Sequence, residues 1–251
     1  MFEVAIVGSG PAGASCAAFC AAAGIRTLLL EREKFPREKV CGDCLNPSCT
    51  PVLERLQLGE RVRALPHAAL KRVDFIAFGG HTVSVPLPDR AEIAVKRSVF
   101  DELLMQRAAE AGAEVRDANV VSAVAPPKSL SDGWTITVGG SNVVARVLVA
   151  ADGRNSSVAR LLGMLPRIRK ERIALQAHVP LPPGFGERVV LQFLRHGYSG
   201  QAPVGPNELN VCLVSTAEKM PVVRTWAENA FGISPTQAWR TITPLRRDPV
   251  T

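Results

Sequence analysis

The chain has 251 residues, of which 47% are hydrophobic, and a formal net charge of +7. That length and apolar content suffice for one large or two small hydrophobic cores, which excludes a disordered protein. The densest basic run, Arg167 to Arg172, has no aromatic residues interleaved with it. We therefore expect a solvated face there and no binding of nucleic acid.

The N-terminal segment predicts a strand, a glycine turn, a helix and a second strand. Apolar residues Phe2 to Val7 lead into Gly-Ser-Gly-Pro-Ala-Gly at 8–13, and small residues follow at 14–23. A second apolar run, Thr27 to Leu30, ends at Glu31. This order, with an acid after the second strand, is typical of the βαβ unit that binds the ADP half of a dinucleotide.

Each glycine of this turn has a physical role. Gly8 allows a tight turn, Gly10 lets the backbone approach a pyrophosphate, and Gly13 lets the helix lie close to the sheet. The helix N-terminus attracts the anion through its free N–H groups and its dipole. The charge of Glu31, which is placed to accept from ribose hydroxyls, disfavours a 2′-phosphate, so FAD or NAD fits better than NADP. The cofactor-binding residues expected in this segment are Gly8, Gly10, Ala12, Gly13, Glu31 and Arg32.

The apolar N-terminus does not have the pattern of a secretory signal. It has no basic residue before Arg26, and glycines and Pro11 interrupt it. No other stretch approaches the length of a membrane span. We expect a cytoplasmic protein without an integral membrane segment.

Six cysteines allow several interpretations. Cys16 and Cys20 are expected to be small buried residues of the first helix, and the histidines are scattered singly, so we expect no metal site. The segment from Cys44 to Cys49 resembles the CxxxxC redox segment of FAD-dependent disulfide reductases. That family carries a second dinucleotide fingerprint, and the nearest candidate here, at 184–189, lacks the third glycine. A disulfide reductase using Cys44 and Cys49 is therefore the alternative interpretation.

The same loop matches another family over a longer stretch. Residues 35–43, Phe-Pro-Arg-Glu-Lys-Val-Cys-Gly-Asp, resemble the FPRxKxCG segment of the geranylgeranyl reductase and halogenase-like flavoproteins, within the group typified by p-hydroxybenzoate hydroxylase. The resemblance implies that Gly42 binds the cofactor and that Cys41 and Asp43 lie near the flavin ring as candidate catalytic residues. From turn chemistry alone, the loop could equally be held by a buried Cys41 and by Asp43 bonding its own backbone.

Two further segments agree with this family. The apolar run before Asp152, followed by Gly153 and Ser156, resembles its DG motif, which implies contacts with the flavin pyrophosphate and ribityl chain and a role toward the pyridine nucleotide. Arg97 precedes a predicted helix that runs to about Ala111, with Ser98 as its cap, and matches an arginine that contacts the cofactor. The expected strands at 113–116 and 119–124 resemble the family segment whose backbone meets the adenine, which implies this contact for Val121.

The second half of the chain predicts strands separated by proline and glycine turns, at 172–179, 188–194 and 210–214. With an earlier pair at 71–78 and 81–85, these would form an antiparallel sheet, and residues 197–205 resemble a segment that lines the family's substrate cavity. The expected fold is α/β: a Rossmann-like FAD-binding domain of the glutathione-reductase type (1–70 and 96–165) and an antiparallel β-sheet substrate-binding domain (71–95 and 166–251).

The resemblance implies an FAD-dependent oxidoreductase that takes hydride from NAD(P)H as co-substrate. Its reaction would be monooxygenation or double-bond reduction of a small organic molecule. The family carries a third cofactor motif that would begin near Thr251, so we expect a further segment or a partner to complete the FAD site. A non-catalytic nucleotide-binding fragment is a second alternative.

Overall fold

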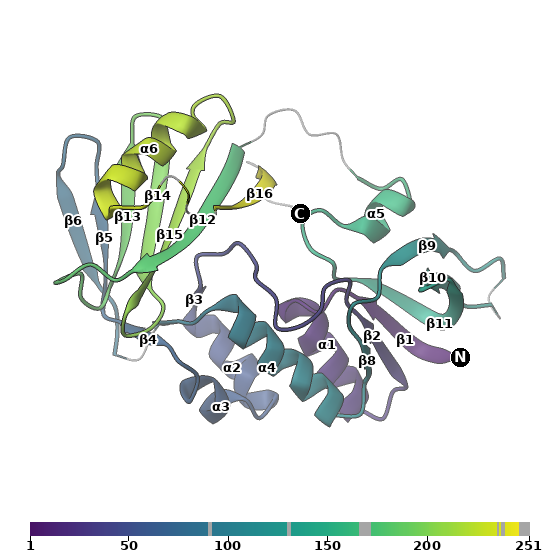
Figure 1. Cartoon of the computed structure of the whole chain (residues 1–251). Helices are drawn as coiled ribbons and strands as arrows, with labels where there is room; N and C mark the ends of the chain where they lie inside the picture. Colours follow the sequence, from purple (N-terminus) through teal and green to yellow (C-terminus); the bar gives the residue numbers. More distant parts are fainter. Residues whose placement is uncertain (90–91, 130–131, 166–171, 235, 237–238, 246–251) are drawn as a thin grey trace. The chain divides into compact units, whose positions relative to one another are not determined.

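The computed structural model of the chain describes residues 1–89, 92–129, 132–165, 172–234, 236 and 239–245. The chain divides into two compact units (Figure 1). Unit 1 comprises Met1–Glu38, Val52–Val62 and Ser98–Arg167, and unit 2 comprises Lys39–Pro51, Arg63–Arg97 and Ile168–Thr251. The basic residues expected on a solvated face lie mostly within 166–171, outside the described residues.

Unit 1 is built on a mixed six-stranded sheet with the order β8-β2-β1-β11-β10-β9. Strands β8, β2, β1 and β11 run parallel, whereas β11, β10 and β9 form an antiparallel meander. The strands are β1 (Phe2–Val7), β2 (Thr27–Leu30), β8 (Glu114–Arg116), β9 (Val121–Ala125), β10 (Trp134–Val138) and β11 (Ser141–Ala150). The helices are α1 (Pro11–Ala22), α2 (Thr50–Arg55), α3 (Gly59–Arg63), α4 (Arg97–Glu110) and α5 (Ser157–Leu161), of which α2, α3 and α4 extend by a residue or two into unit 2.

The first βαβ unit follows from its sequence. All four residues of β2 are buried, as expected for a central parallel strand. Helix α1 packs on β1 and β2 through Gly13, Ala14, Ala17 and Ala18, whose small side chains allow close approach. Cys16 and Cys20 are half-buried free thiols, so the expectation that they are buried is only partly met.

Unit 2 holds a seven-stranded sheet with the order β16-β12-β15-β14-β13-β5-β6 and a three-stranded sheet with the order β3-β7-β4. The strands are β3 (Cys44–Leu45), β4 (Ala68–Leu70), β5 (Arg72–Ile76), β6 (Thr82–Pro86), β7 (Glu92–Ala94), β12 (Arg172–Pro180), β13 (Arg188–Leu194), β14 (Gly197–Pro203), β15 (Glu208–Ser215) and β16 (Arg240–Leu245). Helix α6 (Met220–Phe231) covers one face of the large sheet, where Val223 and Ala227 pack against Leu209, Val211 and Leu213.

The α/β fold class is confirmed, but some details differ from the sequence expectations. The large sheet is not wholly antiparallel, because β5 pairs with β13 in parallel. Helix α4 begins at Arg97, so Ser98 lies inside its first turn and does not precede it as a cap. By contacts, residues 39–51 and 63–70 group with unit 2, whereas we expected them in the first domain. No helix in the described ranges is long and apolar enough to cross a membrane.

Candidate functional site

The turn between β1 and α1 has the backbone geometry that an anion site needs. Gly8 has a φ of 101°, and a Cβ there would lie 2.5 Å from the Ala151 oxygen. Gly10 is the N-cap of α1, no side chain caps the helix, and its first turn, which contains Ala12, carries no acid. The Ser9 hydroxyl is buried without a hydrogen-bond partner among the described residues. The turn therefore presents free donors to a negatively charged group.

Glu31 is placed at the carboxyl end of β2, next to this turn. The side chain is nearly buried, and Oε2 accepts a hydrogen bond of 2.9 Å from the Ser9 N–H. Oε1 accepts from the Glu33 N–H at 3.0 Å. Because a carboxylate oxygen has two lone pairs, each can accept one more bond, as a ribose diol requires. The neighbouring Arg32 side chain is 57% exposed and pairs with Glu33, so it lies on the surface.

The Asp152–Gly153 turn lies beside the glycine turn of unit 1. The Cα of Asp152 is 2.5 Å from the position that a Gly8 Cβ would take, so the two turns are in direct contact. Asp152 Oδ2 accepts from the Ser157 and Val158 N–H groups, the first two of α5, while Oδ1 is buried without a partner among the described residues. Val121, which begins β9, packs in the core, so only its backbone could meet a nucleotide. The ends of parallel strands β1, β2 and β11 thus bring Gly8, Gly10, Gly13, Glu31, Asp152 and Gly153 together.

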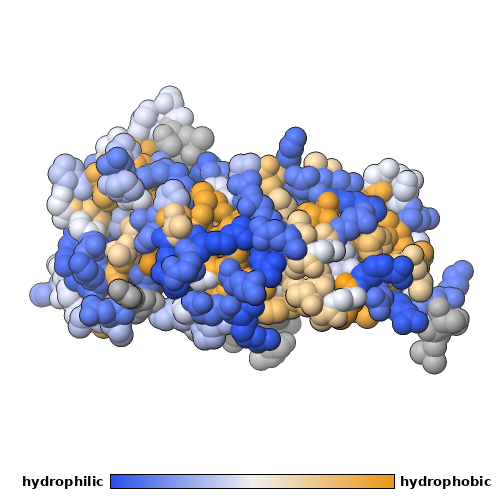
Figure 2. Space-filling view, turned by 90° about the horizontal axis from the view of Figure 1, so that it is seen from below, coloured by the Kyte–Doolittle hydropathy of each residue, from blue (hydrophilic) through white to orange (hydrophobic). Residues whose placement is uncertain are grey.

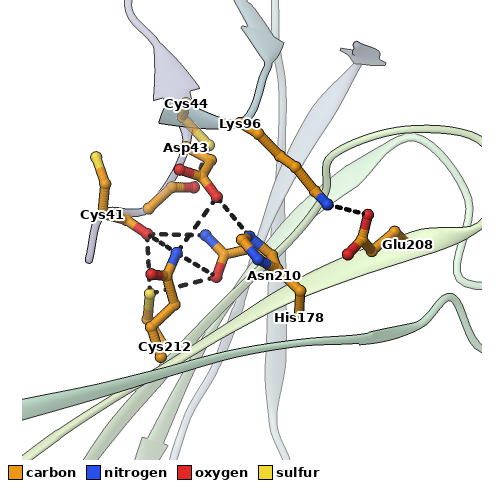
Figure 3. Close-up of polar contacts among 10 residues, drawn as sticks. Cys41, Asp43, Cys44, Lys96, His178, Glu208, Asn210 and Cys212 are labelled. Atoms are coloured by element: carbon orange, nitrogen blue, oxygen red, sulfur yellow. Dashed lines mark hydrogen bonds and ion pairs between the residues drawn. The ribbon is translucent and has the colours of Figure 1, made fainter. Parts of the chain in front are cut away.

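The remaining predicted residues, Cys41, Gly42, Asp43 and Arg97, belong to unit 2. Figure 3 shows a polar cluster here, defined as Cys41, Asp43, Gln176, His178, Asn210 and Cys212. By strand register, this cluster lies on the face of the large sheet opposite α6. The carbonyl oxygen of Cys41 accepts from Gln176 Nε2 at 2.9 Å, Asn210 Nδ2 at 2.8 Å and Cys212 Sγ at 3.1 Å. Three side chains of β12 and β15 therefore hold the loop by its backbone, while the Cys41 side chain points away from them.

Asp43 is the most constrained residue of the polar cluster. It adopts a φ of 58°, which is uncommon for a residue with a side chain, and it is 2% exposed. Oδ2 lies 2.8 Å from His178 Nε2 and accepts from Gln176 Nε2 at 3.3 Å, whereas Oδ1 is buried without a partner among the described residues. The side chain bonds His178 and not its own backbone turn, which overturns the purely local interpretation of this loop.

Burial dominates the ionisation of the polar cluster. It raises the pKa of the Asp43 carboxyl, although His178 and the Arg97 backbone N–H favour the charged form. Burial also raises the pKa of Cys212 to about 12 and, with the nearby Glu92 carboxylate, the pKa of Cys44 well above its usual value. These thiols are therefore poor sources of thiolate.

The comparisons with known proteins agree with this geometry. The sequence profile of the FAD binding domain family matches residues 1–230. The chain belongs to this family of FAD-binding flavoproteins. The β1–α1 turn fits the cofactor, because its uncapped helix end and its partnerless Ser9 hydroxyl offer donors where the pyrophosphate would lie.

This flavoprotein resembles reductases and halogenases. It is 29% identical over 226 residues to the menaquinone reductase of Mycolicibacterium smegmatis, a match that covers 83% of this chain and 54% of that protein. It is 30% identical over 231 residues to digeranylgeranylglycerophospholipid reductase 1 of Methanopyrus kandleri, covering 84% and 56%. The chain thus spans about half the length of these relatives. A flavoprotein/dehydrogenase structure from Cytophaga hutchinsonii has the same fold, with a TM-score of 0.80, 21% identity, and coverage of 96% of this chain and 66% of that one.

The sequence interpretation missed Gln176, His178 and Asn210, which complete the polar cluster. The sequence pattern of β12 and β15 could have indicated these residues. Gln176 and His178 alternate with buried apolar residues of β12, and Asn210 and Cys212 do the same on β15. Polar residues at every second position of an otherwise apolar strand indicate one polar face.

We expect Asp43→Asn to raise the melting temperature of the protein at neutral pH. Because the folded-state pKa of Asp43 lies above the ordinary 3.8, protonation of this carboxyl contributes stability that is full below pH 3.8 and is lost as the pH rises through the folded pKa. Asparagine is neutral at every pH and tolerates a positive φ. The difference in melting temperature between variant and wild type should grow with pH, by about 2–4 °C for each kcal/mol gained.

Asp74→Asn is the matched control for this pH series. Burial raises the pKa of Asp74, but hydrogen bonds from Ser84 and Arg72 and the charge of Arg188 outweigh it, so the net pKa is lowered. Its charged form therefore contributes stability that is present above pH 3.8 and lost in acid. Scanning calorimetry between pH 2 and 8 should show that the destabilisation by Asp74→Asn is constant above pH 3.8 and shrinks below it, whereas the stabilisation by Asp43→Asn grows above pH 3.8. Parallel trends would contradict the raised pKa of Asp43.

Proposed function

We propose that this protein is an FAD-dependent oxidoreductase that takes hydride from NAD(P)H and reduces a carbon–carbon double bond of an apolar isoprenoid lipid. The observation that carries the flavin part is the contact of the glycine turn with Glu31 and Asp152 at the ends of β1, β2 and β11. The finer assignment to a reductase rests on the relatives, since menaquinone and digeranylgeranylglycerophospholipid, named in two of them, are isoprenoid lipids.

The large sheet of unit 2 supports an amphipathic substrate. Directly paired residues point to the same face, and one row across the sheet reads Gln176, Cys212, Gly200, Leu191, Phe75 and Val83. The row is polar at the β12 end and apolar at the β6 end. Val83 is 63% exposed, and Val85 and Phe193 are also exposed. Figure 2 shows one face of the molecule, on which hydrophobic patches alternate with hydrophilic ones.

Individual residues of the chain would have separate roles in this reaction. When bound, FAD supplies hydride transfer between the nicotinamide and the substrate. The backbone from Gly8 to Gly13 holds the pyrophosphate, Glu31 accepts from the ribose, and Asp152, Arg97 and Gly42 are proposed to complete the cofactor contacts. Asp43 Oδ2 and His178 Nε2 hold one proton between them, which the reduction of a double bond consumes after hydride addition. Cys41 is proposed to shape the site, because three side chains hold its carbonyl.

The test begins with the visible spectrum of the purified chain, with and without added FAD. We expect flavin absorption, its bleaching by NADH or NADPH without oxygen, and a gain of two hydrogens in the isoprenoid chain of menaquinone or of a digeranylgeranyl lipid, located by fragment-ion mass spectrometry after the quinone has been reoxidised in air. A chain that cannot be reconstituted with FAD would overturn the whole proposal. Bound flavin that neither nucleotide reduces would overturn the hydride donor, and oxygenated product would favour a monooxygenase.

We expect Cys44→Ser/Cys49→Ser to retain its flavin and NAD(P)H oxidation within about two-fold, since a high thiol pKa disfavours a redox dithiol at Cys44. Both cysteines are free thiols in the structure. The measurement is NADH and NADPH oxidation by the double variant, with Cys49→Ser alone as control for the packing change at Cys44. Loss of a dithiol-dependent turnover in the double variant would instead support the disulfide reductase.

A further inference from the structure

In unit 1, Glu31 belongs to a buried ion-pair network with Arg37 and Asp101. Arg37 Nε is 3.6 Å from Glu31 Oε2, and Arg37 NH1 is 3.0 Å from Asp101 Oδ2. The side chains of Glu31, Arg37 and Asp101 are 7%, 10% and 0% exposed. The Arg37 guanidinium also lies over the Phe35 ring, 4.8 Å from its centre.

Arg37 is fixed independently of Glu31. Asp101 belongs to helix α4 and Phe35 to the segment after β2, so an ion pair and a ring contact hold the guanidinium from two other directions. A fixed cation next to Oε2 attracts the Glu31 carboxylate and favours the orientation that the Ser9 N–H also requires. A carboxylate that is already oriented before the ligand binds loses less conformational freedom on binding, so it binds a ligand hydroxyl more tightly.

We propose that Arg37, held by Asp101, is a positioning residue that orients Glu31 for the ribose hydroxyls of the adenosine half of the cofactor. This rests on the proposed binding of FAD. Arg37 does not touch the ribose itself in this proposal. Its effect passes through Glu31, so it should depend on the ribose hydroxyls of the ligand and on the Glu31 carboxylate.

The informative variant is Arg37→Lys. Lysine keeps the positive charge, so the general attraction for a diphosphate is retained, but one ammonium group cannot bridge two carboxylates as the guanidinium does. The probes are ADP and 2′,3′-dideoxy-ADP, titrated calorimetrically into the full chain. We expect Arg37→Lys to weaken ADP about five- to ten-fold and dideoxy-ADP less than two-fold. Arg37→Met, which also removes the charge, should weaken both nucleotides.

A second measurement separates positioning from a general loss of structure. In a Glu31→Gln background, Arg37→Lys should cause no further loss of ADP affinity, because the carboxylate that it orients is already absent. Equal losses for ADP and dideoxy-ADP, or additive losses in the double variant, would overturn the positioning role. A wild-type chain that binds neither ADP nor FAD would overturn the proposed function instead.

Discussion

Gly13→Ala is expected to weaken FAD binding strongly and to destabilise unit 1. A Cβ at Gly13 would overlap the backbone oxygen of Gly8 and lie 3.1 Å from the Ala151 Cβ. Backbone cannot rotate away as a side chain can, so α1 must move off the sheet or the turn must open. Overpacking of this kind costs about 1–3 kcal/mol of stability. The turn whose N–H groups hold the pyrophosphate is the part that moves, so FAD affinity should fall at least about a hundred-fold.

Gly59→Ala is the matched control for this prediction. Gly59 is the first residue of α3 in unit 1, and the three atoms nearest to a Cβ there all belong to the carboxyl end of the Glu54 side chain. That group is flexible and can move, so the variant should bind FAD as the wild type does. Fluorescence titration with FAD and thermal melts of both variants give the comparison. A Gly13→Ala protein that binds FAD normally would contradict the close approach of α1 to the Gly8 turn.

The part of the site that could be predicted from sequence is the part built from consecutive residues. The Gly8–Gly13 turn, β1, β2 and Glu31 lie within one βαβ unit, and each is specified by local chemistry: glycine at a positive φ, small residues in the helix, and an apolar strand ending in an acid. The predicted bounds of β1, β2 and β13 match the structure. Local rules are sufficient wherever neighbouring residues make the structure.

The part that could not be predicted depends on contacts between distant segments. His178 meets Asp43 across a separation of 135 residues, and only the register of β12 against β15 brings Gln176 and Asn210 to the same loop. Strand β14 contains Gly197, Ser199 and Gly200, which have little preference for strands, and it forms because β13 and β15 pair with both of its edges. From the sequence, Arg37 is recognisable only as the arginine of the FPRxKxCG segment. Its proposed positioning role depends on the ion pair with Asp101 of α4, which the sequence does not reveal.

Asp43→Asn is expected to slow turnover of the substrate by about a hundred-fold or more, the usual contribution of a positioned acid or base. Asparagine can keep the hydrogen bond to His178 and the positive φ, but it has no proton to give. Flavin binding and the anaerobic reduction of bound flavin by NAD(P)H should be unchanged, because neither step uses the proton held by this pair. The wild-type rate should depend on pH, whereas the residual rate of the variant should not follow the same profile.

A buried carboxyl that costs stability at neutral pH is expected where its chemistry is needed. Asp43→Asn should therefore combine a higher melting temperature with a lower rate, and this pairing separates a functional role from a structural one. Asp74→Asn, on the opposite face of the same sheet, should lower the melting temperature and leave the rate unchanged, because Asp74 is stabilised as a charge by Arg72 and Arg188 and faces away from the polar cluster. Turnover is measured by mass spectrometry of a short-chain menaquinone, after the wild type has been shown to reduce it. If Asp43→Asn kept full turnover with its flavin bound, the proton would have to come from another group, and the Asp43–His178 pair would be left with the single task of holding the loop.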